Sequence, residues 1–268
     1  IGITGVGGII GGLVRPFLEA KGHNVIGIDR ERPRSQGAPG ISAEVFEACP
    51  SSIDRPCDLS DASKCQGIFE GCTDIIHLAA QGSASAPMVE DILPNNIEAT
   101  INVINAAKDA GTVKRIVFAS TNHVMHGLTM GEHGPGSMSM DRMKHAGGPG
   151  SIGTSHPFSP DSPYAVSKIF GEMLGQYHAQ VLNDFDFVAL RIGWCAYDDP
   201  GALQGTIHDD YLRAMWLSKR DAVGFFNSAL EVDLKGMRFL SAYAVSNNPT
   251  CPFNLEESSA ALGYKPKD

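Results

Sequence analysis

Two residues of this chain are spaced so that they could take a proton from an alcohol. Tyr164 and Lys168 are four positions apart in the segment Pro163-Tyr-Ala-Val-Ser-Lys168, and this spacing puts both side chains on one face of a helix. A tyrosine side chain ordinarily titrates near about 10, so its use as a base near neutrality requires a preference for the phenolate of about 4 kcal/mol. An ammonium group one helical turn away can supply part of that stabilisation. The pair therefore predicts proton abstraction, with Tyr164 as the base.

A hydroxyl group at the end of a buried strand completes this set. The run Arg115-Ile-Val-Phe-Ala-Ser120 is mostly apolar, which is typical of a strand covered on both faces of a parallel sheet. Thr121 follows directly and can donate a hydrogen bond to the substrate oxygen while Tyr164 takes the proton. Ser120 is the competing residue, but we expect it to face the other side of the strand end.

The first residues of the chain predict a site for a dinucleotide. Gly5, Gly8 and Gly11 lie between a strand-like run and the start of a helical pattern, where glycine permits a tight turn and a close approach of the backbone. The N–H groups at the start of that helix, with its dipole, can bind a pyrophosphate. The cationic nicotinamide of such a cofactor would favour the tyrosine phenolate further and accept the hydride.

An acidic residue indicates which dinucleotide binds. Asp29 ends the second strand-like run, close to the distance of about 20 residues expected after the glycine turn. A carboxylate there accepts hydrogen bonds from the adenosine ribose and repels a 2′-phosphate, so we predict NAD rather than NADP. Arg30, Arg32 and Arg34 follow it; they either weaken this discrimination or form a solvated charged loop.

The elements that must position these residues follow a βαβ rhythm. We expect strands near residues 1–4, 24–29, 74–79, 115–120, 186–192 and 238–243, and helices near 8–21, 61–71, 88–110 and 161–183. The predicted fold class is α/β, a Rossmann-type doubly wound parallel sheet with its ligand-binding edge at the strand ends, and a small C-terminal substrate-binding cap. After Ile192 the alternation becomes irregular. The predicted domains are an NAD-binding domain of residues 1–193, its sheet completed by about 220–245, and a cap made from 194–219 and 246–268.

The segment 125–160 breaks this rhythm. It is rich in Gly, Met, His, Ser and Pro and is too long for a plain connection. Its methionines and histidines are ligands that a soft metal prefers, but their spacing is irregular, and methionine adapts well to a mobile lid. We predict no metal site and, as a hypothesis, a loop that folds over the substrate.

Composition limits the partners of the protein. The chain has 21 Lys+Arg against 30 Asp+Glu, a formal net charge of −9, which disfavours nucleic acid as a partner. No apolar run reaches the roughly 18 residues of a membrane span, and the start of the chain lacks the pattern of an export signal. No Cys-x-x-Cys pair occurs, so we expect reduced thiols and a cytoplasmic location. The six cysteines are Cys49, Cys57, Cys65, Cys72, Cys195 and Cys251.

Together these motifs resemble those of the extended short-chain dehydrogenases/reductases, the NAD-dependent epimerase/dehydratase family. The matching segments run nearly end to end: the glycine turn, Asp58-Leu59, His77-Leu-Ala-Ala80, Asn96-Ile-Glu-Ala-Thr-Ile-Asn102, Ser120-Thr121, Tyr164 with Lys168, Arg191-Ile-Gly193 and Leu262-Gly-Tyr-Lys-Pro266. The resemblance implies that Asp58 and Leu59 flank the adenine and that Asn96 supports the geometry of the site. The full set of cofactor contacts that we expect is Gly5, Gly8, Ile9, Ile10, Gly11, Asp29, Arg30, Asp58, Leu59, Leu78, Ala79, Ala80, Asn96, Ala119, Tyr164, Lys168 and Ile192.

Two segments are similar to particular members of that family. Ala119-Ser-Thr-Asn122-His123 and Met215-Trp-Leu-Ser-Lys-Arg-Asp221 look most like the uronate dehydrogenases and the archaeal NAD-dependent glucose-6-phosphate dehydrogenases. This resemblance implies oxidation of a sugar or sugar acid at its anomeric hydroxyl, giving a lactone. An amide and a neutral imidazole suit a polyol, although His123 could instead be a strand-end histidine paired to the backbone. The substrate contacts that we expect are Ser83, Thr121, Asn122, His123, Tyr164, Trp194 and Arg213.

The chain departs from the uronate enzymes in two places. They carry a serine where Trp194 stands, and a carboxylate-binding arginine where Tyr211 stands; the nearest arginine here is Arg213. An arginine is the natural bidentate partner of a carboxylate or phosphate, so its displacement weakens the case for a uronate. Trp194 either stacks on a sugar or packs the cap.

Two other functions stay open. A nucleotide-sugar epimerase could use the same scaffold, although dehydratases of this family place an Asp-Glu pair where Asn122 and His123 stand. A regulator without catalysis is disfavoured, because the catalytic set is intact. By analogy with relatives we expect a homodimer formed through helices 88–110 and 161–183.

Overall fold

The computed structural model describes residues 1–30 and 52–268; the predictions for Arg32, Arg34 and Cys49 fall outside these residues. The strands form one seven-stranded sheet in the order β3-β2-β1-β4-β5-β6-β7, and every neighbouring pair is parallel. The order reverses beside β1, at the kind of switch point where open α/β sheets bind ligands. The predicted α/β class with a Rossmann-type parallel sheet is confirmed. The strands are β1 (Gly2–Thr4), β2 (Ile26–Asp29), β3 (Arg55–Pro56), β4 (Asp74–His77), β5 (Arg115–Thr121), β6 (Asp186–Ile192) and β7 (Phe239–Ala244).

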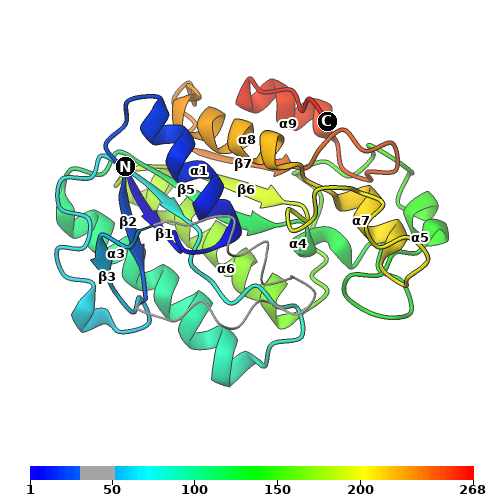
Figure 1. Ribbon diagram of the computed structural model, residues 1–268, viewed down its shortest axis with the longest axis horizontal. Helices are drawn as coiled ribbons and strands as arrows, with labels where there is room; N and C mark the ends of the chain where they lie inside the picture. The colour runs from blue at the N-terminus through cyan, green and yellow to red at the C-terminus, as the bar shows by residue number, and fades with distance from the viewer. Residues whose placement is uncertain (31–51) are drawn as a thin grey trace.

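Helices cover both faces of the sheet (Figure 1). One face carries α1 (Ile9–Ala20), α8 (Lys219–Glu231) and α9 (Leu255–Leu262), and the other carries α3 (Ala99–Ala110) and α6 (Pro163–Tyr177). The sheet thus lies between two layers of helices. Both faces of its central strands are covered, which explains why these strands are apolar on both sides rather than alternating.

Each face has its own apolar cluster. On one side Leu18 of α1 and Phe225 of α8 pack with Ile3 of β1. On the other side Val103 of α3 packs with Phe118 of β5. The amphipathic pattern of each helix therefore buries its apolar side against the sheet.

Most predicted elements are confirmed with small shifts of their ends, and one is wrong. The stretch 61–71 contains only the short helix η1 (Ala62–Lys64). Gly67 and Gly71 have φ of 70° and 77°, and this left-handed backbone interrupts a helix. The two-residue strand β3 was not predicted, because two residues carry no periodicity. The helix predicted at 88–110 begins as the π-helix η2 (Met88–Glu98), where Pro94 supplies no N–H group.

The chain after β6 returns to the sheet. The helix α7 (Asp209–Met215) is followed by α8 and β7, so a further βαβ unit completes the sheet. The strand predicted near 238–243 is confirmed as β7, and α7 lies within the segment 194–219 where irregular alternation was predicted. No helix within the described residues combines the length and the apolar character needed to span a bilayer.

The segment 125–160 is folded against the C-terminal part of the chain. It begins within α4 (His123–His126) and includes α5 (Met140–His145), and Figure 1 shows both near α7 at one end of the sheet. Met125 and Ile152 are buried in a third apolar cluster with Tyr211 and Phe253, and Ile152 forms a parallel bridge to Phe253. The segment therefore forms a packed wall at the carboxyl ends of the strands.

Candidate active site

A pocket lies at the switch point of the sheet, where β1, β2 and β4 end. Most of its lining residues are among the predicted cofactor contacts. Four lining residues were not predicted as cofactor contacts: Cys57, Ser60, Asn95 and Ala99. In the sequence, only their position close to predicted contacts could have indicated them. The pocket is lined by Gly5, Gly8, Asp29, Arg30, Cys57, Asp58, Leu59, Ser60, Leu78, Ala79, Ala80, Asn95 and Ala99.

The glycine turn between β1 and α1 permits a close approach of the backbone to a ligand. Gly5 has a φ of 70°, and a Cβ there would lie 2.6 Å from the backbone nitrogen of Ala79. A Cβ on Gly11 would lie 2.6 Å from the carbonyl oxygen of Val6, so α1 packs directly on the turn. Gly8 is the N-cap residue of α1, and it has no side chain that could accept a hydrogen bond from the first N–H groups of this helix. These N–H groups can therefore bind an anion. These features fit the pyrophosphate of a dinucleotide.

Two carboxylates border the pocket. Asp29 accepts hydrogen bonds from the backbone N–H groups of Gly7 at 2.9 Å and Arg30 at 2.8 Å. A carboxylate has about four acceptor positions, so ribose hydroxyls can still bind to it. Asp58 accepts from the hydroxyl of Ser60 at 2.8 Å. Burial acts to raise the pKa of Asp58, but the hydrogen bonds from Ser60 and the charges of Arg30 and Lys64 together lower it.

The remaining predicted cofactor residues are not among the described residues that line the pocket. Asn96 lies in η2, where its Oδ1 accepts from the N–H of Gln81 at 2.7 Å and its Nδ2 donates to Ser167 Oγ at 2.9 Å. Ser167 belongs to α6, so Asn96 ties the loop after β4 to the helix that carries Tyr164. Ile9, Ile10 and Gly11 form the first turn of α1, and Ala119 and Ile192 lie at the ends of β5 and β6.

The three predicted catalytic residues come together where β5 ends and α6 begins. Thr121 is the last residue of β5, and its side chain is hydrogen-bonded to that of Tyr164 in the first turn of α6. Lys168 follows one turn later and is only 3% exposed. Its Nζ lies 5.8 Å from the ring centre of Tyr164 and 4.9 Å from that of Phe118.

Burial dominates the electrostatics of this group. It raises the pKa of Tyr164 to about 12; the hydrogen bond with Thr121 acts in the opposite direction, and the charge of Asp161 adds to the rise. Burial also lowers the pKa of Lys168 to about 7. A low-dielectric site disfavours both the phenolate and the ammonium, so burial opposes the stabilisation that Lys168 and a cationic nicotinamide are expected to supply together.

Ser120 faces the opposite side of β5, as predicted. Its hydroxyl donates to Glu172, which is fully buried and pairs with Arg191 of β6 at 2.9 Å. Arg191 also donates to the carbonyl oxygen of Thr154 at 3.2 Å. This buried network fixes the ends of β5 and β6 and joins them to the segment 125–160.

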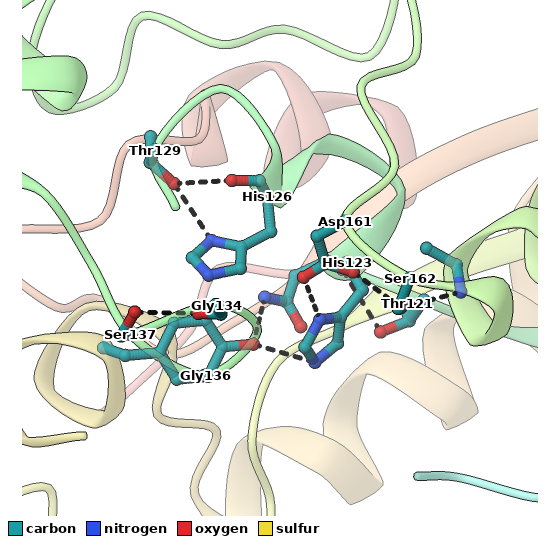
Figure 2. Close-up of polar contacts among 12 residues, drawn as sticks. Thr121, His123, His126, Thr129, Gly134, Gly136, Ser137, Asp161 and Ser162 are labelled. Atoms are coloured by element: carbon teal, nitrogen blue, oxygen red, sulfur yellow. Dashed lines mark hydrogen bonds and ion pairs between the residues drawn. The ribbon is translucent and has the colours of Figure 1, made fainter. Parts of the chain in front are cut away.

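A series of hydrogen bonds begins at Asp161 and passes through His123 (Figure 2). His123 Nδ1 lies 2.6 Å from Asp161 Oδ2, and its Nε2 lies 3.0 Å from the hydroxyl oxygen of Tyr211. Asn122 Nδ2 donates to the same oxygen at 2.7 Å. The His123 ring stands edge-on to the ring of Tyr164, with 5.9 Å between their centres. The alternative that His123 pairs with the backbone is wrong, because both ring nitrogens face side chains.

Three predicted substrate contacts lie further out. Trp194 packs at 5.6 Å from Tyr211, ring centre to ring centre. Arg213 is two positions from Tyr211 on α7, so the two side chains point to different sides of the helix, and Arg213 pairs with Asp209 at 2.6 Å. Ser83 Oγ lies 2.9 Å from Ser85 Oγ in the loop after β4. Within residues 1–30 and 52–268, no hydrogen bond joins Ser83 or Arg213 to the catalytic group.

Asp161 and Tyr211 are the polar residues of the site that the sequence did not assign. Asp161 stands in Asp-Ser-Pro just before α6, a pattern typical of a helix start, and nothing in the sequence joins it to position 123. Tyr211 stood out only because the resemblance to the uronate dehydrogenases implied an arginine at this position.

Comparison with known proteins agrees with this geometry. Residues 1–194 match the NAD dependent epimerase/dehydratase family, and the chain belongs to it. The chain is 32% identical to L-arabinose 1-dehydrogenase (NAD(P)(+)) of Haloferax volcanii over all of this chain and 96% of that protein. It is 30% identical to the NAD-dependent glucose-6-phosphate dehydrogenase of the same organism, over 99% of this chain and 92% of that protein.

A solved structure extends the similarity to the whole fold. A mutant of uronate dehydrogenase from Agrobacterium tumefaciens, complexed with NAD, is 25% identical and superposes with a TM-score of 0.70, covering 100% of this chain and 84% of that one. The family predicted from the motifs is thereby confirmed.

Proposed function

We propose that this protein is an NAD-dependent oxidoreductase that oxidises a hydroxyl group of a sugar or sugar acid. The relatives confirm the predicted class of enzyme and the predicted cofactor, since they include dehydrogenases of sugars and sugar acids and a structure complexed with NAD. The observation that carries the proposal is the hydrogen-bonded pair of Thr121 and Tyr164, beside buried Lys168.

The finer part of the proposal is the reaction itself. The substrate oxygen would bind to Thr121, Tyr164 would take the proton of the reacting hydroxyl, and the hydrogen on the same carbon would leave as hydride while the C=O bond forms. When bound, NAD supplies the hydride acceptor and a positive charge beside the phenol. Lys168 would stabilise the phenolate from one helical turn away. If the reacting hydroxyl is anomeric, the product is a lactone.

The pocket supports a particular placement of the cofactor. The first turn of α1 and the glycine turn would hold the pyrophosphate, Asp29 the adenosine ribose, and Asp58 with Leu59 the adenine. Asn122, His123 and Trp194 lie beyond Tyr164 and would border the sugar, with the segment 125–160 closing that side.

Two further features of the protein are proposed with it. The domain division at residue 193, with a cap on the sugar side, and a cytoplasmic location remain predictions. A homodimer is supported by exposed apolar side chains on two neighbouring helices, η2 and α6. They are Val89 (67% exposed), Leu93 (38%), Val166 (43%) and Met173 (41%).

Replacement of Tyr164 by phenylalanine tests the reaction. We expect NADH formation with a responsive sugar to fall by about 10²–10⁴-fold, while NAD still binds, as measured by fluorescence titration. Full turnover in a Tyr164→Phe protein that binds NAD would refute the mechanism. An epimerase would keep its cofactor and give no steady rise in NADH absorbance with any sugar.

A further inference from the structure

Asp161 lies at the end of the hydrogen-bond chain beside Tyr164 and sets the direction of each bond in it. Its side chain is fully buried, its Oδ2 faces His123 Nδ1 at 2.6 Å, and its Oδ1 accepts from the hydroxyl of Ser162 at 2.7 Å. Burial acts to raise the pKa of Asp161, but the hydrogen bonds with His123 and Ser162, and the positive charge that His123 and His126 carry when protonated, together lower it. An ionised carboxylate only accepts hydrogen bonds, so the hydrogen lies on His123 Nδ1.

When His123 is neutral, this assignment fixes the next two bonds. The lone pair of His123 Nε2 then accepts from the hydroxyl of Tyr211, 3.0 Å away. The oxygen of Tyr211 has given its one hydrogen to the imidazole and accepts from Asn122 Nδ2 at 2.7 Å. Tyr211 and Asn122 are each only 2% exposed, so an unsatisfied polar atom here would be costly. The amide of Asn122 is thereby held with its NH₂ group toward Tyr211.

The orientation of this amide determines where Asn122 Oδ1 lies. No residue in the described part of the chain donates a hydrogen bond to Asn122 Oδ1, and this oxygen is not among the fully enclosed polar atoms that lack a partner. It stands one residue beyond Thr121, at the strand end where the substrate would bind. The series of hydrogen bonds that begins at Asp161 therefore presents a hydrogen-bond acceptor, Asn122 Oδ1, and not a donor, to the ligand.

The surrounding charges also disfavour an anionic ligand at this site. Arg191 is paired with Glu172 at 2.9 Å and Arg213 with Asp209 at 2.6 Å. The charge of Asp161 also contributes to the raised pKa of Tyr164, after the larger effect of burial, so the field at the phenol includes a buried negative charge.

We propose that Asp161 is a positioning residue that selects the substrate. Through His123, Tyr211 and Asn122 it presents an acceptor, so the site favours a sugar that offers a neutral hydroxyl there over one that offers a carboxylate or phosphate. A hydroxyl can donate to Asn122 Oδ1, whereas an anionic oxygen only accepts and meets another acceptor. This inference rests on the proposed sugar dehydrogenase function.

The test compares sugars that share a ring and differ in charge. NADH formation is measured with D-glucose, D-glucuronate and D-glucose 6-phosphate, and with D-galactose and D-galacturonate. We expect kcat/KM for the better neutral sugar to exceed that of its anionic analogues by about ten- to hundredfold, the effect of one mismatched buried hydrogen bond.

Two variants show whether the hydrogen-bond chain causes this preference. In Asp161→Asn the amide can donate to His123 Nδ1, which reverses the bonds as far as Asn122. Tyr211→Phe interrupts the chain without a change of charge. In both we expect the neutral-to-anionic ratio of kcat/KM to fall about tenfold or more, with KM for the neutral sugar changed more than kcat. The matched controls Asp109→Asn and Tyr177→Phe, at exposed positions, should keep the ratio.

The outcomes separate the inference from the function on which it rests. A loss of fold alone would lower kcat/KM for all sugars equally and leave the ratio unchanged. An unchanged ratio in the two site variants, or a parent protein that prefers the anionic sugars, overturns the inference and leaves the dehydrogenase function standing. If Asp161→Asn does not fold, Tyr211→Phe decides. No NADH formation with any sugar would remove the proposed function and the inference together.

Discussion

Lys168 is held in a position that destabilises the fold, and its replacement by methionine should show by how much. Burial lowers its pKa from 10.5 to about 7. Since each pH unit corresponds to about 1.4 kcal/mol, the buried ammonium costs about 5 kcal/mol at low pH. The ring of Phe118, 4.9 Å from Nζ, returns about 2 kcal/mol of cation–π stabilisation. Methionine keeps the aliphatic stem without the charge, so we expect Lys168→Met to raise the free energy of unfolding by about 3 kcal/mol at pH 6.

The dependence on pH has a definite sign. The unfolded chain keeps the ordinary pKa of 10.5, above the folded value of about 7, so between these values the unfolded state binds more protons. Stability of the parent protein therefore rises with pH across this window. The advantage of Lys168→Met is fully present below pH 7 and disappears as pH approaches 10.5.

Urea denaturation followed by circular dichroism from pH 6 to pH 9 measures this difference. Lys144→Met, at a position whose side chain is 72% exposed, is the matched control and should show no comparable gain. The same Lys168→Met protein should lose at least about 99% of its NADH formation. A less stable variant, or a stability difference that is the same at pH 6 and pH 9, would refute the reasoning.

Two other substitutions test separate parts of the structure. Asp29→Ala removes the carboxylate that we expect to repel a 2′-phosphate, so the ratio of kcat/KM for NAD to that for NADP should fall about tenfold or more; an unchanged ratio would mean that another group discriminates. Glu172→Gln takes the charge partner from buried Arg191 and alters the acceptor of Ser120. The free energy of unfolding in urea should fall by about 3 kcal/mol, and a protein as stable as the parent would contradict a structural role for this pair.

The strands and the cofactor end of the site could be predicted because their causes are local in the sequence. A strand covered on both faces must be apolar at consecutive positions, as in β5 and β6. Gly5 must be glycine because its φ is 70° and a Cβ would meet the backbone of Ala79. Asp29 follows from its position at the end of β2. Each of these requirements is set by a few neighbouring residues.

The features that were missed depend on contacts between distant segments. His123 and Asp161 are 38 positions apart, and Tyr211 is 88 positions from His123; only the fold brings them together. The spacing of Tyr164 to Lys168 indicates a favourable charge but carries no measure of burial, which raises the pKa of Tyr164 in the chain alone. The false helix at 61–71 arose because apolar periodicity outweighed Gly67 and Gly71, whose left-handed backbone decides the outcome.

The pKa of Tyr164 depends on burial, on the charge of Asp161 and on the nearby ammonium of Lys168. Tyr164 and Lys168 both favour their neutral forms when each is considered alone, but a phenolate and an ammonium this close attract each other strongly at low dielectric, so the two groups titrate as a pair. Asp161 opposes the phenolate, and its bonds to His123 and Ser162 keep it ionised. The chain alone therefore favours the protonated form of Tyr164, and a positive charge beside the phenol, such as bound NAD would supply, would lower its pKa.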